Sequence, residues 1–163
     1  MAIDTQSTLA FRTMQSDDIT AIVALEVEAF HPPWSRALLE RALANAHSVA
    51  IVAINDAVIV GYALGWTLGA EGELDRIAVA QSCRGQGIGA HLLPEWLRRC
   101  RERGAKEFFL EVREGNRSAQ HLYESCGFAR AGRRPRYYDD GETALIMRLE
   151  YDAAADESEV KVL

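Results

Sequence analysis

The fold of this chain is decided by a glycine-rich stretch, Arg84-Gly85-Gln86-Gly87-Ile88-Gly89. A strand-like run at residues 74–79 precedes it, and an apolar-periodic run at residues 88–100, typical of a helix, follows it. Glycines between a strand and a helix let backbone N–H groups converge without obstruction by Cβ atoms. The positive end of the helix dipole lies at the same place and favours phosphate or pyrophosphate. We therefore predict an anion cradle over residues 84–89.

The glycines allow two other interpretations. They could begin a helix without binding any ligand. The run from Gly85 to Ala90 also fits the dinucleotide pattern G-x-G-x-x-G/A, with Glu111 at the end of the next strand. Against that pattern, residues 80–84 separate the strand from the first glycine, and the remaining chain is too short for a second nucleotide-binding half. A Walker-type phosphate loop is excluded because no Gly-Lys-Ser/Thr follows.

The composition is that of one globular domain. The chain has 163 residues, of which 48% are hydrophobic and 26% charged. No apolar run approaches the roughly 20 residues that a membrane span requires, and residues 1–15 lack the segments of an export signal. Cys83, Cys100 and Cys126 have no C-x-x-C spacing, so a reduced cytoplasm fits best.

The net charge of −6 is unevenly distributed, because residues 150–163 carry −4 and residues 1–149 carry −2. Arginines concentrate in the second half of the body. For those at positions 98–103 we favour a solvated helix face. The alternative is a basic surface that meets a polyanionic cofactor or a ribosomal partner.

Hydrophobic periodicity and turn residues predict the order of the elements. Strands are expected at residues 9–14, 49–54, 58–68, 73–79, 107–113, 129–136 and 143–149. Helices are expected at 19–29 after a cap at 16–18, at 36–44 after Ser35, at 87–103, and from Asn116 to a C-cap at Gly127. Asn55-Asp56 signals a hairpin, and Pro94 should bend the third helix.

This order predicts one domain of the α/β (α+β) class. We expect a mixed, mostly antiparallel sheet of about seven strands flanked by about four helices. The domain should span residues 1–151, and the acidic residues 152–163 should form a disordered tail.

With these residues assembled, the chain resembles the GNAT superfamily of acetyl-CoA-dependent N-acetyltransferases. Residues 84–89 match its Q/R-x-x-G-x-G/A signature, and the element order agrees from residue 9 to residue 149. Within the superfamily the chain is most similar to the bacterial ribosomal-protein-alanine N-acetyltransferases. The segments that carry this closer similarity are His31-Pro32-Pro33-Trp34-Ser35, Leu110-Glu111-Val112-Arg113, residues 116–128, and Arg133-Arg134-Pro135-Arg136-Tyr137-Tyr138. Pro94 departs from the family pattern, and the tail after Glu150 lies outside the resemblance.

The resemblance implies that acetyl-CoA is the co-substrate. Its pyrophosphate would rest on backbone N–H groups of the glycine-rich loop, and its pantetheine would lie along residues 77–79 like an added strand. Backbone amides there could polarise the thioester oxygen. The cofactor-binding residues implied in this way are Ile77, Ala78, Val79, Arg84, Gly85, Gln86, Gly87, Ile88, Gly89, Ala90 and Asn116.

Glu111 is the predicted general base, directly or through an ordered water. It interrupts an apolar run beside two phenylalanines, and the matching position of the resembling family is the proton acceptor. The alternative is a strand-end carboxylate that pairs with Arg113 or Arg117. Glu73 and Asp75, on the neighbouring strand, are competing bases.

Tyr123 is the general acid that the family resemblance implies, whereas the sequence alone favours a core aromatic. A tyrosine with a pKa near 10 stays protonated at neutral pH and can donate to a thiolate. Asn116 lies two helical turns earlier and can face the same cleft, both as N-cap and as cofactor contact. A purely structural alternative makes Tyr123 a core aromatic. Trp34, Tyr137 and Tyr138 are expected to line the acceptor groove, each with an ordinary packing role as the alternative.

We expect direct transfer without a metal. The histidines share no metal-ligand spacing, and Cys126 precedes a C-cap glycine, where it is expected to be buried filler. An α-amine has a pKa of about 7.7–8.0 against about 10.4 for lysine, so roughly a tenth of it is free base at neutral pH. A single glutamate therefore suffices for a protein N-terminus. The resemblance implies the N-terminal alanine of a small-subunit ribosomal protein.

Three other functions stay open at this point. The acceptor could be a lysine or a small-molecule amine, the chain could be a non-catalytic acyl-CoA sensor, or its arginine face could bind RNA or the ribosome. We expect no direct nucleic-acid or membrane partner. Nothing in the sequence specifies the oligomeric state, for which a monomer is favoured.

Overall fold

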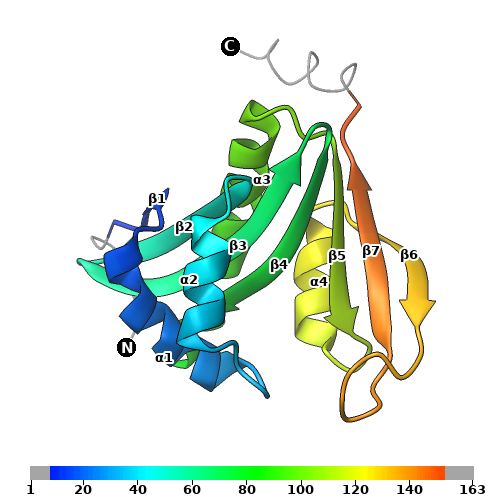
Figure 1. The fold of residues 1–163 in the computed structure, drawn as a ribbon, viewed down its shortest axis with the longest axis horizontal. Helices are drawn as coiled ribbons and strands as arrows, with labels where there is room; N and C mark the ends of the chain where they lie inside the picture. The colour runs from blue at the N-terminus through cyan, green and yellow to red at the C-terminus, as the bar shows by residue number, and fades with distance from the viewer. Residues whose placement is uncertain (1–7, 153–163) are drawn as a thin grey trace.

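Residues 8–152, which the computed structural model describes, form one seven-stranded sheet in the order β1-β2-β3-β4-β5-β7-β6 (Figure 1). The strands are β1 (Ala10–Thr13), β2 (Ser48–Asn55), β3 (Val58–Leu68), β4 (Glu71–Val79), β5 (Glu107–Arg113), β6 (Ala129–Arg134) and β7 (Ala144–Glu150). The helices are α1 (Ile19–Ala29), α2 (Arg36–Ala44), α3 (Ile88–Glu102) and α4 (Arg117–Ser125), with 3-10 turns at Ser16–Asp18 and Gln81–Cys83. The predicted fold class is confirmed.

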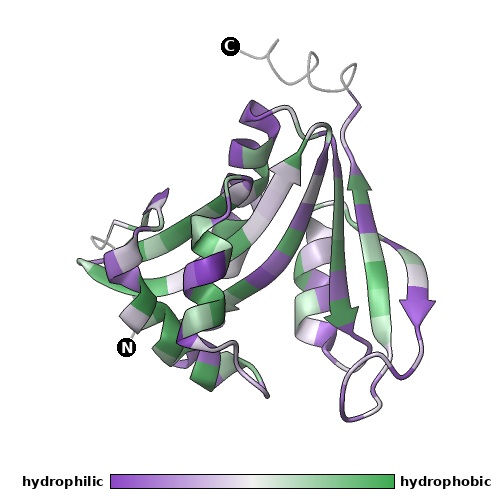
Figure 2. Ribbon diagram, viewed as in Figure 1, coloured by the Kyte–Doolittle hydropathy of each residue, from purple (hydrophilic) through white to green (hydrophobic). Residues whose placement is uncertain are grey.

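Strands β2 and β3 are buried on both faces, with α1 and α2 over one face of the sheet and α3 and α4 over the other (Figure 1). Side chains of a strand alternate between faces, so Val49 and Ile51 of β2 enter the core under α3 while Ala50 and Val52 enter the core under α1 and α2. Figure 2 shows the resulting hydrophobic stretches on β2, β5 and β7. Trp96 of α3 anchors its core by donating a hydrogen bond to the Val49 carbonyl at 2.9 Å.

The sheet forks between β4 and β5. These parallel strands pair only from Glu71 and Glu107 to Leu74 and Leu110, and they diverge beyond that point (Figure 1). A bulge lies at the same place, because Gly65 of β3 pairs with Leu74 while its neighbour Leu64 pairs with Arg76. The extra residue of a bulge bends its strand and increases its twist. Strands β4 and β5 therefore separate next to the bulge, after the pair formed by Leu74 and Leu110.

The local signals read from the sequence are confirmed with small shifts, except at the start of α1. There residues 16–18 form a 3-10 turn, and Asp18 makes no side-chain cap to α1 because its carboxylate accepts from Arg12 and from the Gln15 N–H at 2.7 Å. Ser35 Oγ accepts the Leu38 N–H at 3.2 Å, and Asn116 Oδ1 accepts the Ala119 N–H at 3.1 Å. Gly127 adopts φ of 99° past the end of α4. The β2–β3 turn falls one residue later than predicted. Its central residues are Asp56 and Ala57, with φ of 49° and 66°, because β2 continues through Asn55.

Two expectations stay untested. Helix α3 runs through Pro94 from Ile88 to Glu102, and the expected bend there stays a prediction. The expected disordered tail falls almost entirely on residues 153–163, outside the described residues. None of the helices within residues 8–152 combines the length and apolar character that crossing a membrane requires.

Gly65, which pairs with Leu74 at the bulge, has less room for a side chain than any other described glycine. A Cβ atom there would lie 2.1 Å from the Glu73 carbonyl oxygen and 2.5 Å from Trp96 Cζ2. We expect Gly65→Ala to lower the free energy of unfolding by about 3 kcal/mol or more, because neither backbone nor core indole can move freely. Urea unfolding measures this. The matched control is Gly132→Ala, whose nearest contact would be an ordinary 3.5 Å to Ile146; equal losses in the two variants would contradict the prediction.

Candidate active site

The glycine-rich loop is built as an open backbone surface at the start of α3. Gly85 and Gly87 adopt φ of 76° and 81°, a left-handed conformation that favours glycine. A Cβ at Gly85 would meet no heavy atom within 4 Å. Gly87 caps α3, so the first-turn N–H groups of this helix lie beside the loop. Arg84 folds back and donates to the Val79 carbonyl at 3.2 Å.

The outer edge of β4 leads from the fork to this loop. Its other edge pairs with β3, as in Ala63 with Ile77 and Tyr62 with Ala78. The pairing with β5 ends at Leu74, so the backbone of residues 77–79 presents an edge to which an extended molecule can add. The side chains of Ile77 and Val79 pack against the core, as predicted, and it is their backbone that faces the fork.

Glu111 is the first residue of β5 beyond the last pair with β4. Its carboxylate Oε1 lies 3.2 Å from Arg134 Nε, an ion pair with β6 and not the predicted alternative with Arg113 or Arg117. The Tyr137 hydroxyl donates to the same carboxylate, and this bond is the main reason that the pKa of Tyr137 is raised. Tyr137 remains 47% exposed. A carboxylate at the mouth of the fork thus has a cation and a phenol as neighbours.

Tyr123 lies deeper than Glu111, on α4, and is only 7% exposed. Its ring packs edge-on against Phe128, with centroids 6.0 Å apart. Burial raises the pKa of Tyr123, and the neighbouring Tyr138 raises it further. The hydroxyl therefore keeps its proton at neutral pH. Asn116 uses its Oδ1 to cap the same helix, which leaves its amide nitrogen as a donor.

Comparison with known proteins assigns the family. A model of the acetyltransferase (GNAT) family matches residues 19–128. The chain belongs to this family. It is 38% identical over 138 residues to N-alpha-acetyltransferase RimI of Mycobacterium tuberculosis, covering 80% of this chain and 85% of the relative. It is 31% identical over 138 residues to the ribosomal protein bS18-alanine N-acetyltransferase of Haemophilus influenzae, covering 82% and 93%.

A solved structure agrees with these relatives. The crystal structure of the ribosomal-protein-S18-alanine N-acetyltransferase from Escherichia coli superposes with a TM-score of 0.81 at 29% identity, covering 89% of this chain and 95% of that one. The chain is thus a GNAT N-acetyltransferase. The resemblance read from the signature and the element order is confirmed.

Two further carboxylates of this GNAT enzyme lie at the fork. Burial raises the pKa of Glu73, and the charge of Glu111 raises it further. Burial, followed by the charge of Glu73, raises the pKa of Asp75 to about 7. Asp75 is the extra residue of the bulge, so the backbone irregularity that opens the fork also places this carboxylate there. Both competing bases of the sequence analysis therefore lie near Glu111.

The predicted acceptor-side aromatics divide into two groups. Tyr137 and Tyr138 pack edge-on with centroids 5.1 Å apart and lie beside Glu111. Trp34 instead stacks its ring on the guanidinium of Arg76, 4.6 Å from the ring centroid. Trp34 thus has a packing contact with the first residue of β4 beyond Asp75, and its place in the acceptor groove stays a prediction.

Sequence reasoning missed the buried charge that supports Arg76. Glu26 of α1 is fully buried. Its carboxylate accepts the Trp34 N–H at 2.9 Å, accepts a short hydrogen bond from the Tyr62 hydroxyl, and lies 3.2 Å from Arg76 Nε. That Nε makes an ion pair without a well-aligned hydrogen bond. The one available signal was a glutamate among the apolar positions of the first helix.

The titration of Asp75 predicts a pH dependence of stability. Its folded-state pKa of about 7 lies above the ordinary value of 3.8, so its contribution to stability is complete below the ordinary pKa and is lost as the pH rises through about 7. Asp75→Asn cannot ionise. We therefore expect its stability relative to wild type to increase between about pH 4 and about pH 8.

Urea unfolding across this pH range measures the difference. Asp17→Asn, at an exposed position, controls for removal of a carboxylate. A constant difference between Asp75→Asn and wild type at all pH values would contradict the assignment of a raised pKa to Asp75.

Proposed function

We propose that this enzyme transfers the acetyl group of acetyl-CoA directly to the N-terminal alanine of a small-subunit ribosomal protein, with bS18 as the substrate by analogy with its relatives. The observation that carries the proposal is the position of Glu111, the first residue beyond the β4–β5 pairing, beside the unpaired edge of β4. The names of the relatives at 31% and 38% identity support an N-terminal amine as acceptor. Such a substrate is made in the cytoplasm, where we expect the enzyme to act.

The chain has a surface that suits coenzyme A. The left-handed glycines at 85 and 87 leave the loop open, and the dipole of the 15-residue helix α3 favours a pyrophosphate at its start. The N–H groups of residues 85–90 would hold the phosphates, with Arg84 and Asn116 beside them. Residues 77–79 would hold the pantetheine through their backbone. Bound acetyl-CoA supplies the thioester.

Glu111 would accept the proton that the attacking amine loses as its nitrogen bonds to the acetyl carbon. Arg134 and Tyr137 hold the carboxylate in place. The Tyr123 hydroxyl would give its proton to the leaving sulfur as the C–S bond breaks. Because burial disfavours the phenolate, we expect this donation to accompany bond cleavage and not to precede it.

A direct transfer is supported by the state of Cys126. This thiol is half-buried at the end of α4, and burial raises its pKa. A thiol is nucleophilic only as the thiolate, so Cys126 is a poor candidate for an acyl-enzyme. Asp75 is the second candidate for the base, because its raised pKa of about 7 suits proton transfer at neutral pH.

Acceptor and base can be tested together. Two peptides are incubated with enzyme and acetyl-CoA: one with a free N-terminal alanine and no lysine, the other with a blocked N-terminus and one lysine. Mass spectrometry should find acetyl groups on the first alone. Glu111→Gln should lower kcat by about 100-fold to 10,000-fold, the usual size of general-base catalysis. Tyr123→Phe should also lower kcat.

Glu71→Gln is the matched control, because Glu71 begins β4 at an exposed position at the far end of the β4–β5 pairing. Equal modification of both peptides would refute the N-terminal acceptor. If Glu111→Gln kept wild-type kcat while Asp75→Asn lost it, Asp75 would be the base.

The cradle can be tested separately from catalysis. Gly87→Ala forces a side chain into φ of 81° at the start of α3, and we expect it to weaken the Kd for coenzyme A by about tenfold, about 1.4 kcal/mol. Isothermal titration calorimetry measures the Kd. Gly69→Ala introduces comparable strain, with φ of 59°, in the turn between β3 and β4. Equal weakening in both variants would show that strain alone, and not the cradle, changes binding.

A further inference from the structure

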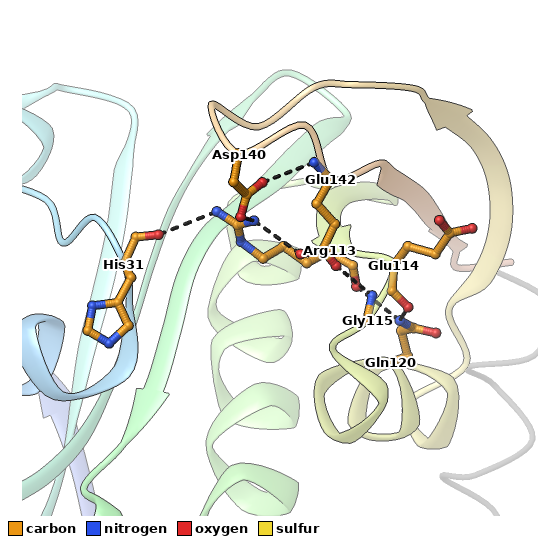
Figure 3. Close-up of polar contacts among 7 residues, drawn as sticks. All are labelled: His31, Arg113, Glu114, Gly115, Gln120, Asp140 and Glu142. Carbon is orange, nitrogen blue, oxygen red and sulfur yellow. Dashed lines mark hydrogen bonds and ion pairs between the residues drawn. The ribbon is translucent and has the colours of Figure 1, made fainter.

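One guanidinium joins three segments of the chain beside the fork (Figure 3). Arg113, at the end of β5, places Nη1 2.8 Å from Asp140 Oδ2 and 3.1 Å from Glu142 Oε1. Its Nη2 donates to the His31 carbonyl at 3.4 Å. Asp140 and Glu142 belong to the loop between β6 and β7, and His31 belongs to the loop between α1 and α2. Arg113 therefore bridges two loops that are far apart in the sequence.

The same guanidinium reaches the base through two aromatic rings. It lies over the ring of Tyr138, 4.0 Å from the centroid. Tyr138 packs edge-on against Tyr137, whose hydroxyl bonds Glu111. Arg113 and Glu111 are two residues apart on one strand, so their side chains leave the same face of the sheet. A continuous set of contacts thus runs from Arg113 to Glu111.

The partners of Arg113 are themselves held in place. Glu142 Oε2 accepts the Gly115 N–H at 2.8 Å, and Asp140 Oδ1 accepts the Glu142 N–H at 3.0 Å (Figure 3). The side chain of Gln120 donates to the carbonyls of Arg113 and Glu114 at 3.0 and 2.9 Å. The turn after β5 and the β6–β7 loop are therefore fixed to each other, and the α1–α2 loop is joined to them through Arg113.

We propose that Arg113 is a positioning residue for the acceptor peptide. It holds the α1–α2 and β6–β7 loops together on the acceptor side and sets Tyr138 and Tyr137 against Glu111. A planar guanidinium can pair with two carboxylates while it stacks on a ring, whereas a lysine ammonium cannot do both in this geometry. The inference rests on the proposed peptide acceptor and adds the residue that shapes its site.

The main test compares Arg113→Met and Arg113→Lys with wild type in steady-state kinetics. We expect the KM for the alanine peptide to rise on the order of tenfold in both variants, since misplacement by about 1 Å can cost up to 100-fold. The KM for acetyl-CoA should stay within about twofold. Arg133→Met is the control, because Arg133 forms an exposed ion pair at 2.7 Å with Glu114, which belongs to neither loop. An unchanged peptide KM, or full rescue by lysine, would overturn the proposal.

A double-mutant cycle tests the route through Tyr138. Because Arg113 acts through this ring, Arg113→Met should cost less in the Tyr138→Leu background than in wild type. Strict additivity would show that the two residues act independently and would overturn the route to Glu111. Asp140→Asn provides a milder change to the same contacts and should raise the peptide KM by less than Arg113→Met.

Hydrogen exchange tests, without any substrate, whether Arg113 holds the two loops together. In Arg113→Met the amides of residues 136–142 should exchange faster than in wild type. In Arg133→Met the same amides should exchange at the wild-type rate. Wild-type exchange in Arg113→Met would overturn the proposal. Failure of the wild-type enzyme to acetylate the peptide would count against the proposed acceptor, while the exchange experiment would still decide the bridge.

Discussion

The end of hydrogen bonding between β4 and β5 is the constraint from which the rest of the site follows. Pairing stops at Leu74 and Leu110, where the bulge at Asp75 turns β4 away. An unpaired strand edge normally invites association with another chain. In this fold the exposed edge is short, lies between two layers of helices, and leads to the open start of α3 (Figure 1). The interruption in sheet pairing thus leaves an edge of β4 to which an extended molecule can add as a strand.

Three carboxylates, Glu73, Asp75 and Glu111, lie at the fork, and arginines of neighbouring elements compensate their charge. Burial raises the pKa values of Glu73 and Asp75, and the charge of a neighbouring carboxylate raises them further. Arg134 pairs with Glu111. Arg76 is held on the other side between the rings of Phe30 and Trp34, at 4.1 and 4.6 Å from their centroids. The Arg134–Glu111 pair is partly exposed, so losing one of its partners should cost less than losing a partner of a buried pair.

The site is therefore assembled in layers of increasing exposure. Glu26 is fully enclosed and fixes Arg76, Tyr123 is nearly enclosed, and Tyr137 is about half exposed. In the reaction that we propose, the buried acid would face the cofactor and the more accessible carboxylate would face the second substrate. The loops that bound the accessible side are joined by Arg113, whose partners lie on both of them.

The sequence by itself determined the features that depend on neighbouring residues. The left-handed C-cap glycine at 127, the caps at Ser35 and Asn116, and the position of Glu111 on the strand predicted at residues 107–113 all follow from local dihedral preferences and periodicity. Only the tertiary structure decided that Arg134, and not Arg113 or Arg117, pairs with Glu111. It likewise decided that Trp34 stacks on Arg76 and that Asp75 occupies the bulge. These contacts depend on strand register and on which loops meet across the fork, and residues separated by tens of positions carry no local signal of either.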